Sequence, residues 1–196
     1  MTVLHAVQLT VFPQLSMVSR ERRHSANGHG GAVRFFTGLS GSGKSSVAHV
    51  LEAQLFSLGH QVIIVDGDNI RAGLCADLAF DVEGRAENLR RTSEVLQMFV
   101  EAGVIVLATF VAPVAADRAR LRARLDDTTF VEIFCDCPIE VCETRDVKGL
   151  CLRPRSGEIV QLTGVSAPYE APLAPDLRLC TDLESLEASA RSVSVI

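Results

Sequence analysis

The segment GLSGSGKS, residues 38–45, most constrains what this chain can fold into. It matches the pattern G-x-x-x-x-G-K-[ST], it follows the short apolar segment VRFFT, and it opens the segment KSSVAHVLEAQLFSL, which has helical apolar spacing. A glycine-rich loop between a buried strand and a helix cradles phosphate groups, because backbone N–H groups and the helix N-terminus point at the anion. The sequence therefore predicts a phosphate-binding loop in an α/β fold.

Strand-like and helical segments alternate along the rest of the chain. Four more apolar segments are typical of buried strands, namely QVIIV, VIVLATF, TFVEIFC and DLRLC. Helices are predicted at 44–58, where Gly59 ends the helix, at 85–103, between the third and fourth strands, and at 183–193. We expect a P-loop NTPase fold, three-layer α/β/α, with a five-stranded parallel sheet. The helical residues expected to face inward are Val47, Val50, Leu51, Leu55, Leu58, Leu89, Leu96, Phe99 and Val100.

Two segments stand apart from this alternation. Residues 1–31 change from apolar to polar and end in glycines, so we interpret them as an N-terminal extension ahead of a single domain at 32–196. Residues 145–175 are rich in Gly, Pro and Arg and lack a helical period. We interpret them as a long lid loop.

Composition restricts the partners and the compartment. The formal net charge is -5, and lysine occurs only at Lys44 and Lys148, so nucleic-acid binding is not indicated. Six cysteines occur without a CxxC pair, which favours reduced core thiols over disulfides or a zinc site. No run reaches eighteen apolar residues and no export signal is recognisable, so we expect a cytoplasmic protein without a membrane span.

The loop predicts how a nucleotide is held. Lys44 is expected to contact the β- and γ-phosphates, and Ser45 to coordinate Mg²⁺. Guanine-specific relatives of this class carry an Asn-Lys-x-Asp motif that is missing here, so ATP is the expected nucleotide. The predicted ATP-binding residues of the loop are Gly38, Leu39, Ser40, Gly41, Ser42, Gly43, Lys44, Ser45 and Ser46.

Two aspartates follow the second strand in the segment VIIVDGDNIR. Asp66 ends the strand, where a Walker-B carboxylate supports the metal, although an N-cap of the next turn is the alternative. Asp68 lies two residues further on, where a second carboxylate faces an acceptor. Because transfer to an alcohol needs a group that accepts the hydroxyl proton, this pair favours phosphoryl transfer over hydrolysis.

A possible anion site follows the aspartates. Arg85 and Asn88 are three residues apart at a helix start, so both side chains can reach one anionic group, with Arg71 nearby. An exposed salt-bridge face is the alternative for these residues. Phe80, in a polar loop, either stacks on a base or pins the loop to the core.

Several of these segments together resemble the adenylylsulfate kinases. The resemblance covers roughly residues 19–185 and rests on FFTGLSGSGKSS, DGDNIRAGL, RAENLRR, DCPIEVCETRD, KGL and APYEAP, in this order and spacing. It implies ATP- and Mg²⁺-dependent phosphorylation of the 3′-hydroxyl of adenosine 5′-phosphosulfate to give 3′-phosphoadenosine 5′-phosphosulfate, in sulfate assimilation. It also implies a homodimer.

The resemblance assigns roles by position. Asp68 would be the catalytic base and Lys44 a catalytic phosphate contact, with Ser45 and Asp66 at the metal. Lid arginines would close over ATP, and these are Arg145, Arg153 and Arg155. The implied substrate-binding residues are Asp68, Arg71, Phe80, Arg85, Asn88, Val111, Lys148 and Leu162.

The chain departs from the family pattern in two places. Ala112 in FVAP replaces a serine often given as a phosphoserine intermediate. In-line transfer needs no protein nucleophile, so we expect activity without that serine. Leu162 stands where the family often has a phenylalanine, which removes one stacking face for adenine and costs about tenfold in affinity or less. Val114 and Ala115 also replace an aromatic and a basic residue.

These departures leave two alternative functions open. One is a kinase of the same architecture that acts on another small alcohol. The other is a nucleotide-binding sensor without catalysis. The presence of Lys44, Asp66, Asp68 and Arg85 together argues against the sensor, because a sensor needs the phosphate loop but not a base that faces an acceptor.

Overall fold

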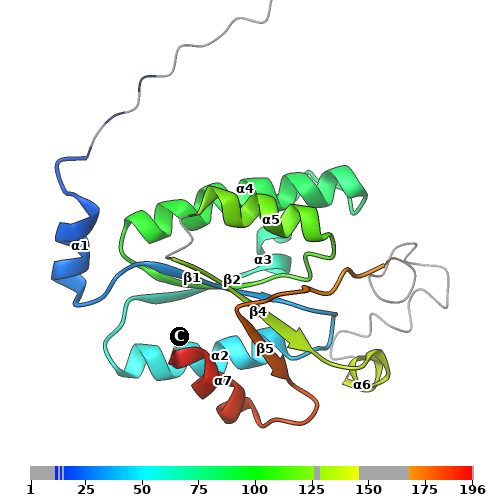
Figure 1. The fold of residues 1–196 in the computed structure, drawn as a ribbon. Helices are drawn as coiled ribbons and strands as arrows, with labels where there is room; N and C mark the ends of the chain where they lie inside the picture. Colours follow the sequence, from blue (N-terminus) through cyan, green and yellow to red (C-terminus); the bar gives the residue numbers. More distant parts are fainter. Residues whose placement is uncertain (1–11, 13, 15, 126–128, 146–167, 196) are drawn as a thin grey trace, which may run out of the picture.

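β1 is the central strand of the sheet, and the phosphate loop follows it at the carboxyl edge of the sheet (Figure 1). The computed structural model describes residues 12, 14, 16–125, 129–145 and 168–195. Within them, five parallel strands pair in the order β2-β3-β1-β4-β5. β1 lies between β3 and β4, so later strands are added on both sides of it. The loop that follows β1 therefore lies where the strand order reverses, which is where such sheets bind ligands. The strands are β1 (Ala32–Thr37), β2 (Val62–Asp66), β3 (Ile105–Thr109), β4 (Phe130–Asp136) and β5 (Leu177–Cys180).

Helices cover both faces of the sheet. In Figure 1, α4 and α5 lie on one face, and α2 and α7 on the other. The predicted three-layer fold with a five-stranded parallel sheet is therefore confirmed. The helices are α1 (Arg20–Asn27), α2 (Lys44–Ser57), α3 (Gly67–Ala72), α4 (Val82–Glu101), α5 (Ala115–Arg124), α6 (Ile139–Arg145) and α7 (Leu186–Ser194).

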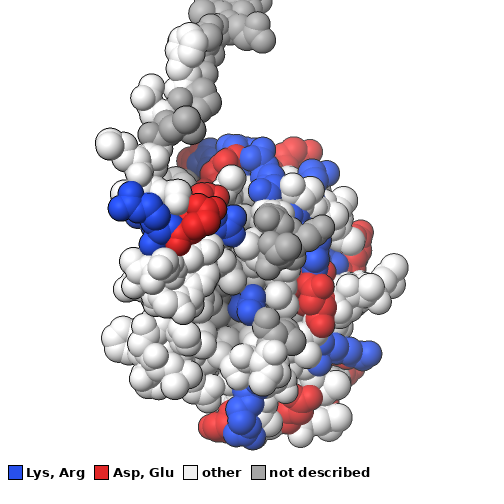
Figure 2. All heavy atoms as spheres, turned by 60° about the vertical axis from the view of Figure 1, so that its left-hand side comes forward, with Lys and Arg blue, Asp and Glu red and all other residues white. Residues whose placement is uncertain are grey.

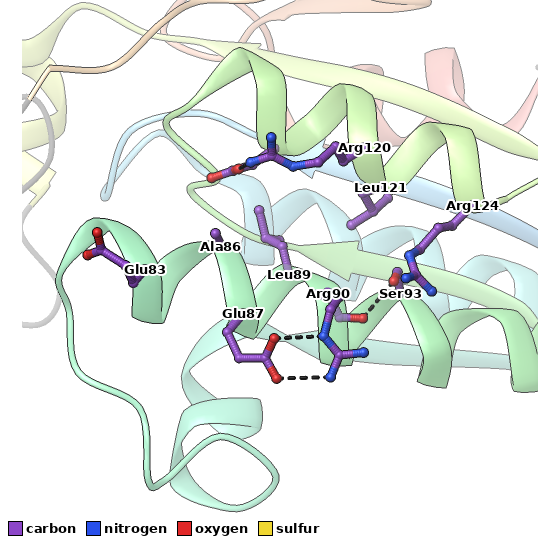
Figure 3. Close-up of a pocket in the computed structure, with 10 residues that line it drawn as sticks. Glu83, Ala86, Glu87, Leu89, Arg90, Ser93, Arg120, Leu121 and Arg124 are labelled. Atoms are coloured by element: carbon purple, nitrogen blue, oxygen red, sulfur yellow. Dashed lines mark hydrogen bonds and ion pairs between the residues drawn. The ribbon is translucent and has the colours of Figure 1, made fainter. Parts of the chain in front are cut away.

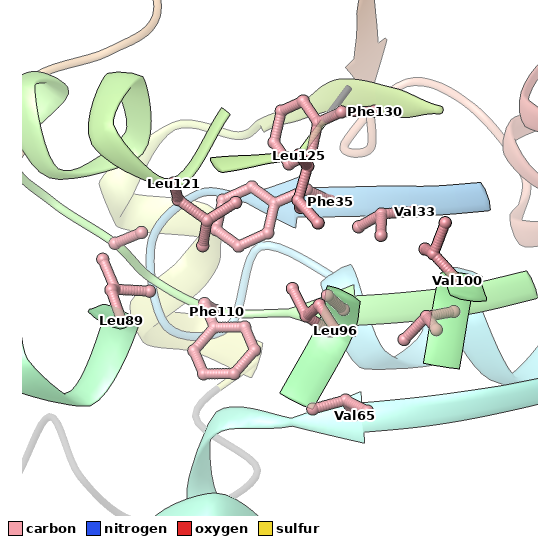
Figure 4. Packing of buried hydrophobic residues seen from close by; sticks show 13 residues of the cluster. Val33, Phe35, Val65, Leu89, Leu96, Val100, Phe110, Leu121, Leu125 and Phe130 are labelled. Atoms are coloured by element: carbon pink, nitrogen blue, oxygen red, sulfur yellow. The ribbon is translucent and has the colours of Figure 1, made fainter. Parts of the chain in front are cut away.

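Two apolar clusters hold the layers together. Alternation along β1 sends Phe35 into the cluster under α4 and α5, and Phe36 into the cluster over α2 and α7. Figure 4 shows the first cluster, in which the ring of Phe35 stacks on those of Phe110 and Phe130 at centroid distances of 5.9 and 5.7 Å. The sheet is thus buried on both faces, as a parallel sheet requires.

The helical periodicity predicted the inward faces with one error. Val47 and Leu51 are buried, Val50 and Leu55 are partly buried against the core, and the expectations for α4 also hold. Leu58 is 72% exposed, so its expected inward position is wrong. It is the C-cap residue of α2, beyond the last helical turn, and Gly59 ends the helix with φ +85° as expected.

Besides α1, two short helices between strands were not expected from the sequence. α3 begins directly after Asp66, whose carboxylate accepts a hydrogen bond from the backbone N–H of Asp68 at 3.0 Å. α6 spans seven residues after β4. Elements of six or seven residues are too short to show a helical period, so only the cap signal at Asp66 pointed to one of them.

A helix, α1, forms inside the predicted N-terminal extension. It buries none of its own residues and is attached by polar contacts: Arg20 pairs with Glu101 at 3.9 Å, and Asn27 donates to the carbonyl of Gly103 at 3.2 Å. Figure 2 shows mixed charges around this helix and a wide uncharged area below it. The domain boundary at residue 32 remains a prediction.

The expected core role of the cysteines is confirmed for four of the five that the structure describes. Cys75, Cys135, Cys137 and Cys142 are buried, and Cys180 is partly exposed. Burial raises the pKa of Cys135 and of Cys142 to about 12, so both thiols stay protonated. Among the described residues, no three His, Cys, Asp or Glu side chains are grouped to hold a metal ion, and no helix is long and apolar enough to cross a membrane.

Candidate active site

The phosphate loop, residues 38–43, joins β1 to α2 and has a backbone that requires glycine at particular positions. Gly38 and Gly41 have φ of +151° and +82°. A Cβ atom at Gly38 would lie 2.5 Å from the carbonyl oxygen of Cys135, and one at Gly41 would lie 2.5 Å from that of Cys142. The loop is therefore packed tightly onto β4 and α6, which holds it in an open ring ahead of α2.

Lys44 begins α2 and turns back over this loop. Its Nζ donates to the carbonyl oxygens of Gly38 at 3.0 Å and Leu39 at 2.7 Å, and the residue is 8% exposed. A buried ammonium group needs such oxygen partners, and they keep it at the mouth of the loop. The charge is thus placed where phosphate oxygens would meet it, as the motif predicts.

Asp66 is the N-cap of α3, as one of the two sequence interpretations expected, and it also contacts Ser45. Its Oδ2 accepts hydrogen bonds from the hydroxyls of Ser45 at 2.9 Å and Thr109 at 2.6 Å, while its Oδ1 caps α3. The carboxylate therefore lies beside the hydroxyl at the start of α2 and also acts as an N-cap. Hydroxyl and carboxylate oxygens are the ligands that Mg²⁺ prefers, so Ser45 and Asp66 fit that ion.

Asp68 lies in the first turn of α3, two residues after Asp66, and is solvent-exposed. The turn that Asp66 caps therefore holds Asp68 at the carboxyl end of β2. A carboxylate at that edge of a parallel sheet can meet a second substrate opposite the phosphate loop.

Arg71 and Phe80 form a stacked pair beyond α3. The guanidinium carbon of Arg71 lies 4.2 Å from the ring centroid of Phe80, and Nη1 donates to the carbonyl of Ala79 at 3.2 Å. The ring remains 62% exposed. The ring is held by Arg71 and is not packed into the core, so the interpretation that it pins the loop to the core is wrong. The exposed surface of the ring leaves stacking on a base as the remaining prediction.

Arg85 and Asn88 lie in the first two turns of α4, and Arg85 contacts the loop that contains Phe80. Arg85 Nε donates to the carbonyl of Phe80 at 2.8 Å, and burial together with the nearby charge of Arg71 lowers the pKa of its guanidinium. Asn88 is 4% exposed, and within the described part of the chain its Nδ2 has no hydrogen-bond partner. A buried amide without a partner costs stability, which suits a group that a ligand satisfies.

The exposed ion pairs of α4 involve other side chains. Arg90 and Arg91 both pair with Glu87, and Arg91 also reaches Asp77 at 2.7 Å. This salt-bridge face is made by Glu87, Arg90 and Arg91, which are not the residues for which the sequence suggested one.

The remaining predicted residues divide between described and undescribed parts of the chain. Arg145 Nη2 donates to the carbonyl of Thr181 at 2.9 Å, and the Thr181 hydroxyl donates to Ser42 in the phosphate loop at 2.7 Å. Arg145 therefore lies beside the phosphate loop, but it is the last residue of α6, whereas the lid predicted from residue 145 requires a loop there. Its contact to ATP stays a prediction. Val111 follows β3, and its carbonyl accepts a hydrogen bond from Thr37. Lys148, Arg153, Arg155 and Leu162 lie outside the described residues.

The chain was compared with known proteins. The family model described as adenylylsulphate kinase matches residues 30–180. The chain belongs to the adenylylsulfate kinase family. The adenylyl-sulfate kinase of Acaryochloris marina is 49% identical to this kinase over 178 residues, 91% of this chain and 87% of the relative. That of Lactiplantibacillus plantarum is 48% identical over 91% of this chain and 86% of the relative.

Solved structures agree with this assignment. The Mycobacterium tuberculosis APS kinase in complex with AMPPNP and APS is 46% identical to this kinase, with a TM-score of 0.81 over 84% of this chain and 96% of that one. A gluconokinase from Sinorhizobium meliloti matches with a TM-score of 0.53 at 16% identity, which shows a shared fold alone. The kinase is therefore an ATP-using phosphotransferase of the P-loop class.

Sequence reasoning missed several polar residues of this kinase. Thr37 ends β1, Thr109 ends β3 and Thr181 follows β5, and each hydroxyl bonds a loop or carboxylate of the site. Their shared position at the carboxyl edge of a parallel sheet was a usable signal.

A separate groove of about 480 Å³ lies between α4 and α5 (Figure 3). Leu89 and Leu121 contribute apolar surface, and its arginines are engaged in ion pairs, for example Arg90 with Glu87 and Arg124 with Glu94. None of the predicted site residues of the kinase lines it. We assign no role to the groove.

Proposed function

We infer that this chain transfers the γ-phosphoryl group of ATP to the 3′-hydroxyl of adenosine 5′-phosphosulfate, giving ADP and 3′-phosphoadenosine 5′-phosphosulfate. The observation that carries this proposal is the Asp66–Asp68 pair at the end of β2. Asp66 bonds Ser45 at the start of α2, and Asp68 lies two residues further on, in the first turn of the helix that also contains Arg71. Family membership supports the substrate pair. ATP then lies on the Asp66 side of this pair, and adenosine 5′-phosphosulfate lies on the Asp68 side.

The donor side has a defined set of groups. The loop amides and Lys44 bind the β- and γ-phosphates, and Arg145 lies beside the loop to compensate the charge that develops on transfer. Ser45 and Asp66 would hold Mg²⁺, which neutralises phosphate charge when bound. These residues therefore orient ATP with its γ-phosphate toward the acceptor.

The acceptor side binds an anion and removes a proton. Arg71 and Arg85 supply positive charge near Phe80, whose exposed ring takes the adenine, and the Nδ2 of Asn88 gains the partner that it lacks among the described residues. Asp68 accepts the proton of the 3′-hydroxyl as the new phosphorus–oxygen bond forms and the bond to the ADP oxygen breaks. The two substrates thus react directly.

Ala112 fits this direct route. It replaces the serine of the phosphoserine hypothesis, and its side chain is a methyl group that cannot form a phosphoester. Positioning and charge stabilisation account for most of catalysis in phosphoryl transfer, so the loss of a hydroxyl there leaves the reaction intact.

A ligand panel in a thermal-shift assay tests the acceptor assignment. A compound that binds only the native state raises the melting temperature, so adenosine 5′-phosphosulfate should stabilise the protein, while gluconate and shikimate should not. Arg85→Ala is the matched variant, which should lose the shift with adenosine 5′-phosphosulfate and keep the shift with ATP. Stabilisation by gluconate or shikimate alone would support a kinase for another alcohol.

Two further proposals rest on the family resemblance. We propose that the protein is a homodimer and that it works in the cytoplasm. Light scattering coupled to size-exclusion chromatography should give twice the mass of the chain, 21.1 kDa. A monomer or a larger assembly would contradict the first proposal. Fractionation of the source cells tests the second.

A further inference from the structure

A chain of two hydroxyl groups joins three parts of the site that are distant in sequence. The Thr37 hydroxyl, at the end of β1, donates to the carbonyl of Val111 at 2.7 Å. The same hydroxyl oxygen lies 3.0 Å from the hydroxyl of Tyr169, which is 132 residues away in the chain. Gly38 of the phosphate loop follows Thr37 directly. The contact therefore links the base of this loop to residues 110–114, which we call the acceptor loop.

The direction of these hydrogen bonds follows from proton counting. A carbonyl only accepts, so the single proton of Thr37 is used on Val111. Tyr169 must then donate to the Thr37 oxygen. Burial raises the pKa of Tyr169 to about 12, which keeps its proton in place at physiological pH. Tyr169 also stacks on Phe134 with centroids 6.1 Å apart, so the ring is fixed independently of its hydroxyl.

A second contact holds the next residue of the acceptor loop. The buried Arg118 donates from Nη1 to the carbonyl of Ala112 and from Nη2 to that of Glu170, both at 2.7 Å, and from Nε to Glu132 at 2.9 Å. Ala112 has φ +43°, a left-handed conformation that costs a non-glycine residue about 1–2 kcal/mol. Two consecutive carbonyls of the acceptor loop are thus held by side chains, in a conformation that alanine does not favour alone.

We propose that Thr37 is a positioning residue for phosphoryl transfer, because its hydroxyl holds the acceptor loop at a set distance from the phosphate loop. This inference rests on the proposed function. ATP is carried by the loop that follows Thr37, and the acceptor loop follows Thr109, which bonds Asp66. In-line transfer depends on the separation of the two substrates, and a displacement of about 1 Å costs about 100-fold in rate.

The position of Thr37 allows an effect on the rate of transfer to be distinguished from an effect on substrate binding. Thr37 is not itself assigned to the binding of ATP or of the acceptor. Its hydroxyl bonds one residue that is, Val111, and it does so at the backbone carbonyl rather than at the side chain. Each substrate has its own anchors, in Lys44 for ATP and in Arg85 for the acceptor. Loss of the Thr37 hydroxyl therefore lowers kcat and leaves the affinity for each substrate alone largely unchanged.

The test compares Thr37→Val with Thr37→Ser, and uses Thr92→Val as a matched control because Thr92 is equally buried but bonds neither loop. We measure kcat, the Kd of a non-hydrolysable ATP analogue and of adenosine 5′-phosphosulfate separately, and the ratio of ADP to phosphorylated product. Thr37→Val should lower kcat at least about tenfold, change each Kd by less than about threefold, and raise the ratio above one as water replaces the 3′-hydroxyl. In Thr37→Ser, kcat, both Kd values and the ratio of ADP to product should be close to those of the wild type.

Four outcomes would overturn the proposal: an unchanged kcat in Thr37→Val, a kcat loss matched by an equal loss of affinity, failure of Thr37→Ser to restore the rate, or an equal kcat loss in Thr92→Val. If Thr37→Val does not fold, Tyr169→Phe removes the donor and keeps the ring, and should raise the ADP-to-product ratio; an unchanged ratio there counts against the proposal. Wild-type protein that binds both ligands without transfer would instead refute the proposed function.

Discussion

The Asp66 carboxylate accepts a hydrogen bond from the Ser45 hydroxyl at 2.9 Å, which joins the end of β2 to the first turn of α2. A second hydroxyl, from Thr109 of β3, donates to the same oxygen at 2.6 Å. Three elements of the site therefore meet at one carboxylate. Because the other oxygen caps α3, the position of Asp68 also depends on it.

Asp66→Asn tests the metal role apart from the structural one. The amide oxygen can still accept the hydrogen bond from the Asp68 backbone N–H, and the Ser45 and Thr109 hydroxyls can rotate to accept from the amide NH2 group. The charge that would hold Mg²⁺ is lost, so kcat/KM should fall at least about 100-fold and the Mg²⁺ concentration for half-maximal rate should rise. The melting temperature should change little. Normal turnover at the wild-type Mg²⁺ requirement would remove Asp66 from the metal site.

Asp68→Ala tests the base. The side chain is exposed to solvent, so its removal should leave the protein folded and the Kd for ATP within about threefold of wild type. Transfer should fall by about 100- to 10,000-fold, the usual contribution of general base catalysis. Isothermal titration and single-turnover kinetics measure the two effects. Near-wild-type transfer would assign proton removal to another group. Asn69→Ala, an exposed neighbour, is the control and should retain full activity.

Asn88→Ala should separate binding from stability. The Nδ2 atom is buried and has no hydrogen-bond partner among the residues that the structure describes, so its loss relieves a cost of about 1–3 kcal/mol that offsets the lost packing. The free energy of unfolding should therefore change by less than about 1.5 kcal/mol. The KM for adenosine 5′-phosphosulfate should rise at least about tenfold. Urea unfolding and steady-state kinetics check both expectations. Thr92→Val, one turn along α4, should leave this KM unchanged; a parallel rise would show that α4 responds as a whole.

Ala112→Ser should add little to turnover. The direct route needs no hydroxyl at this position, so kcat should stay within about threefold of wild type, and no phosphoprotein should form with labelled ATP. A hundredfold gain would contradict direct transfer. Ala112→Gly is the companion change: φ +43° suits glycine, so this variant should lose little or no stability.

Glu87 gives the protein a pH-dependent contribution. Hydrogen bonds from Arg90 and then Arg91 lower its pKa from 4.5 to about 2. A carboxyl group whose folded pKa is depressed stabilises the protein above about pH 4.5, and that stability is lost as the pH falls toward 2. Glu87→Gln should therefore lower the urea midpoint at pH 7 and match wild type near pH 2. An equal difference at both pH values would contradict the assignment.

Much of the site could be predicted because one motif links sequence to geometry. The spacing of GLSGSGKS fixes Lys44 and Ser45 at the start of a helix, and an apolar strand that ends in aspartate places Asp66 beside them. Periodicity likewise predicted the long helices and the five strands, since each buries a continuous face.

The rest depends on contacts that no local pattern encodes. Thr37 and Tyr169 are 132 residues apart in the chain, and no periodic pattern in either segment predicts their contact. The positive φ of Ala112 opposes its own preference and is held by contacts such as that of Arg118. α3 and α6 are shorter than two full turns of apolar repeat, so their existence follows from capping and packing.

The central claim is that the chain phosphorylates the 3′-hydroxyl of adenosine 5′-phosphosulfate without a serine at position 112. The most direct measurement is ADP formation from Mg·ATP and adenosine 5′-phosphosulfate, with the product's 3′-phosphate identified by ³¹P NMR. We predict one 3′-phosphorylated product for each ADP. An absence of transfer, with both ligands bound, would contradict the account.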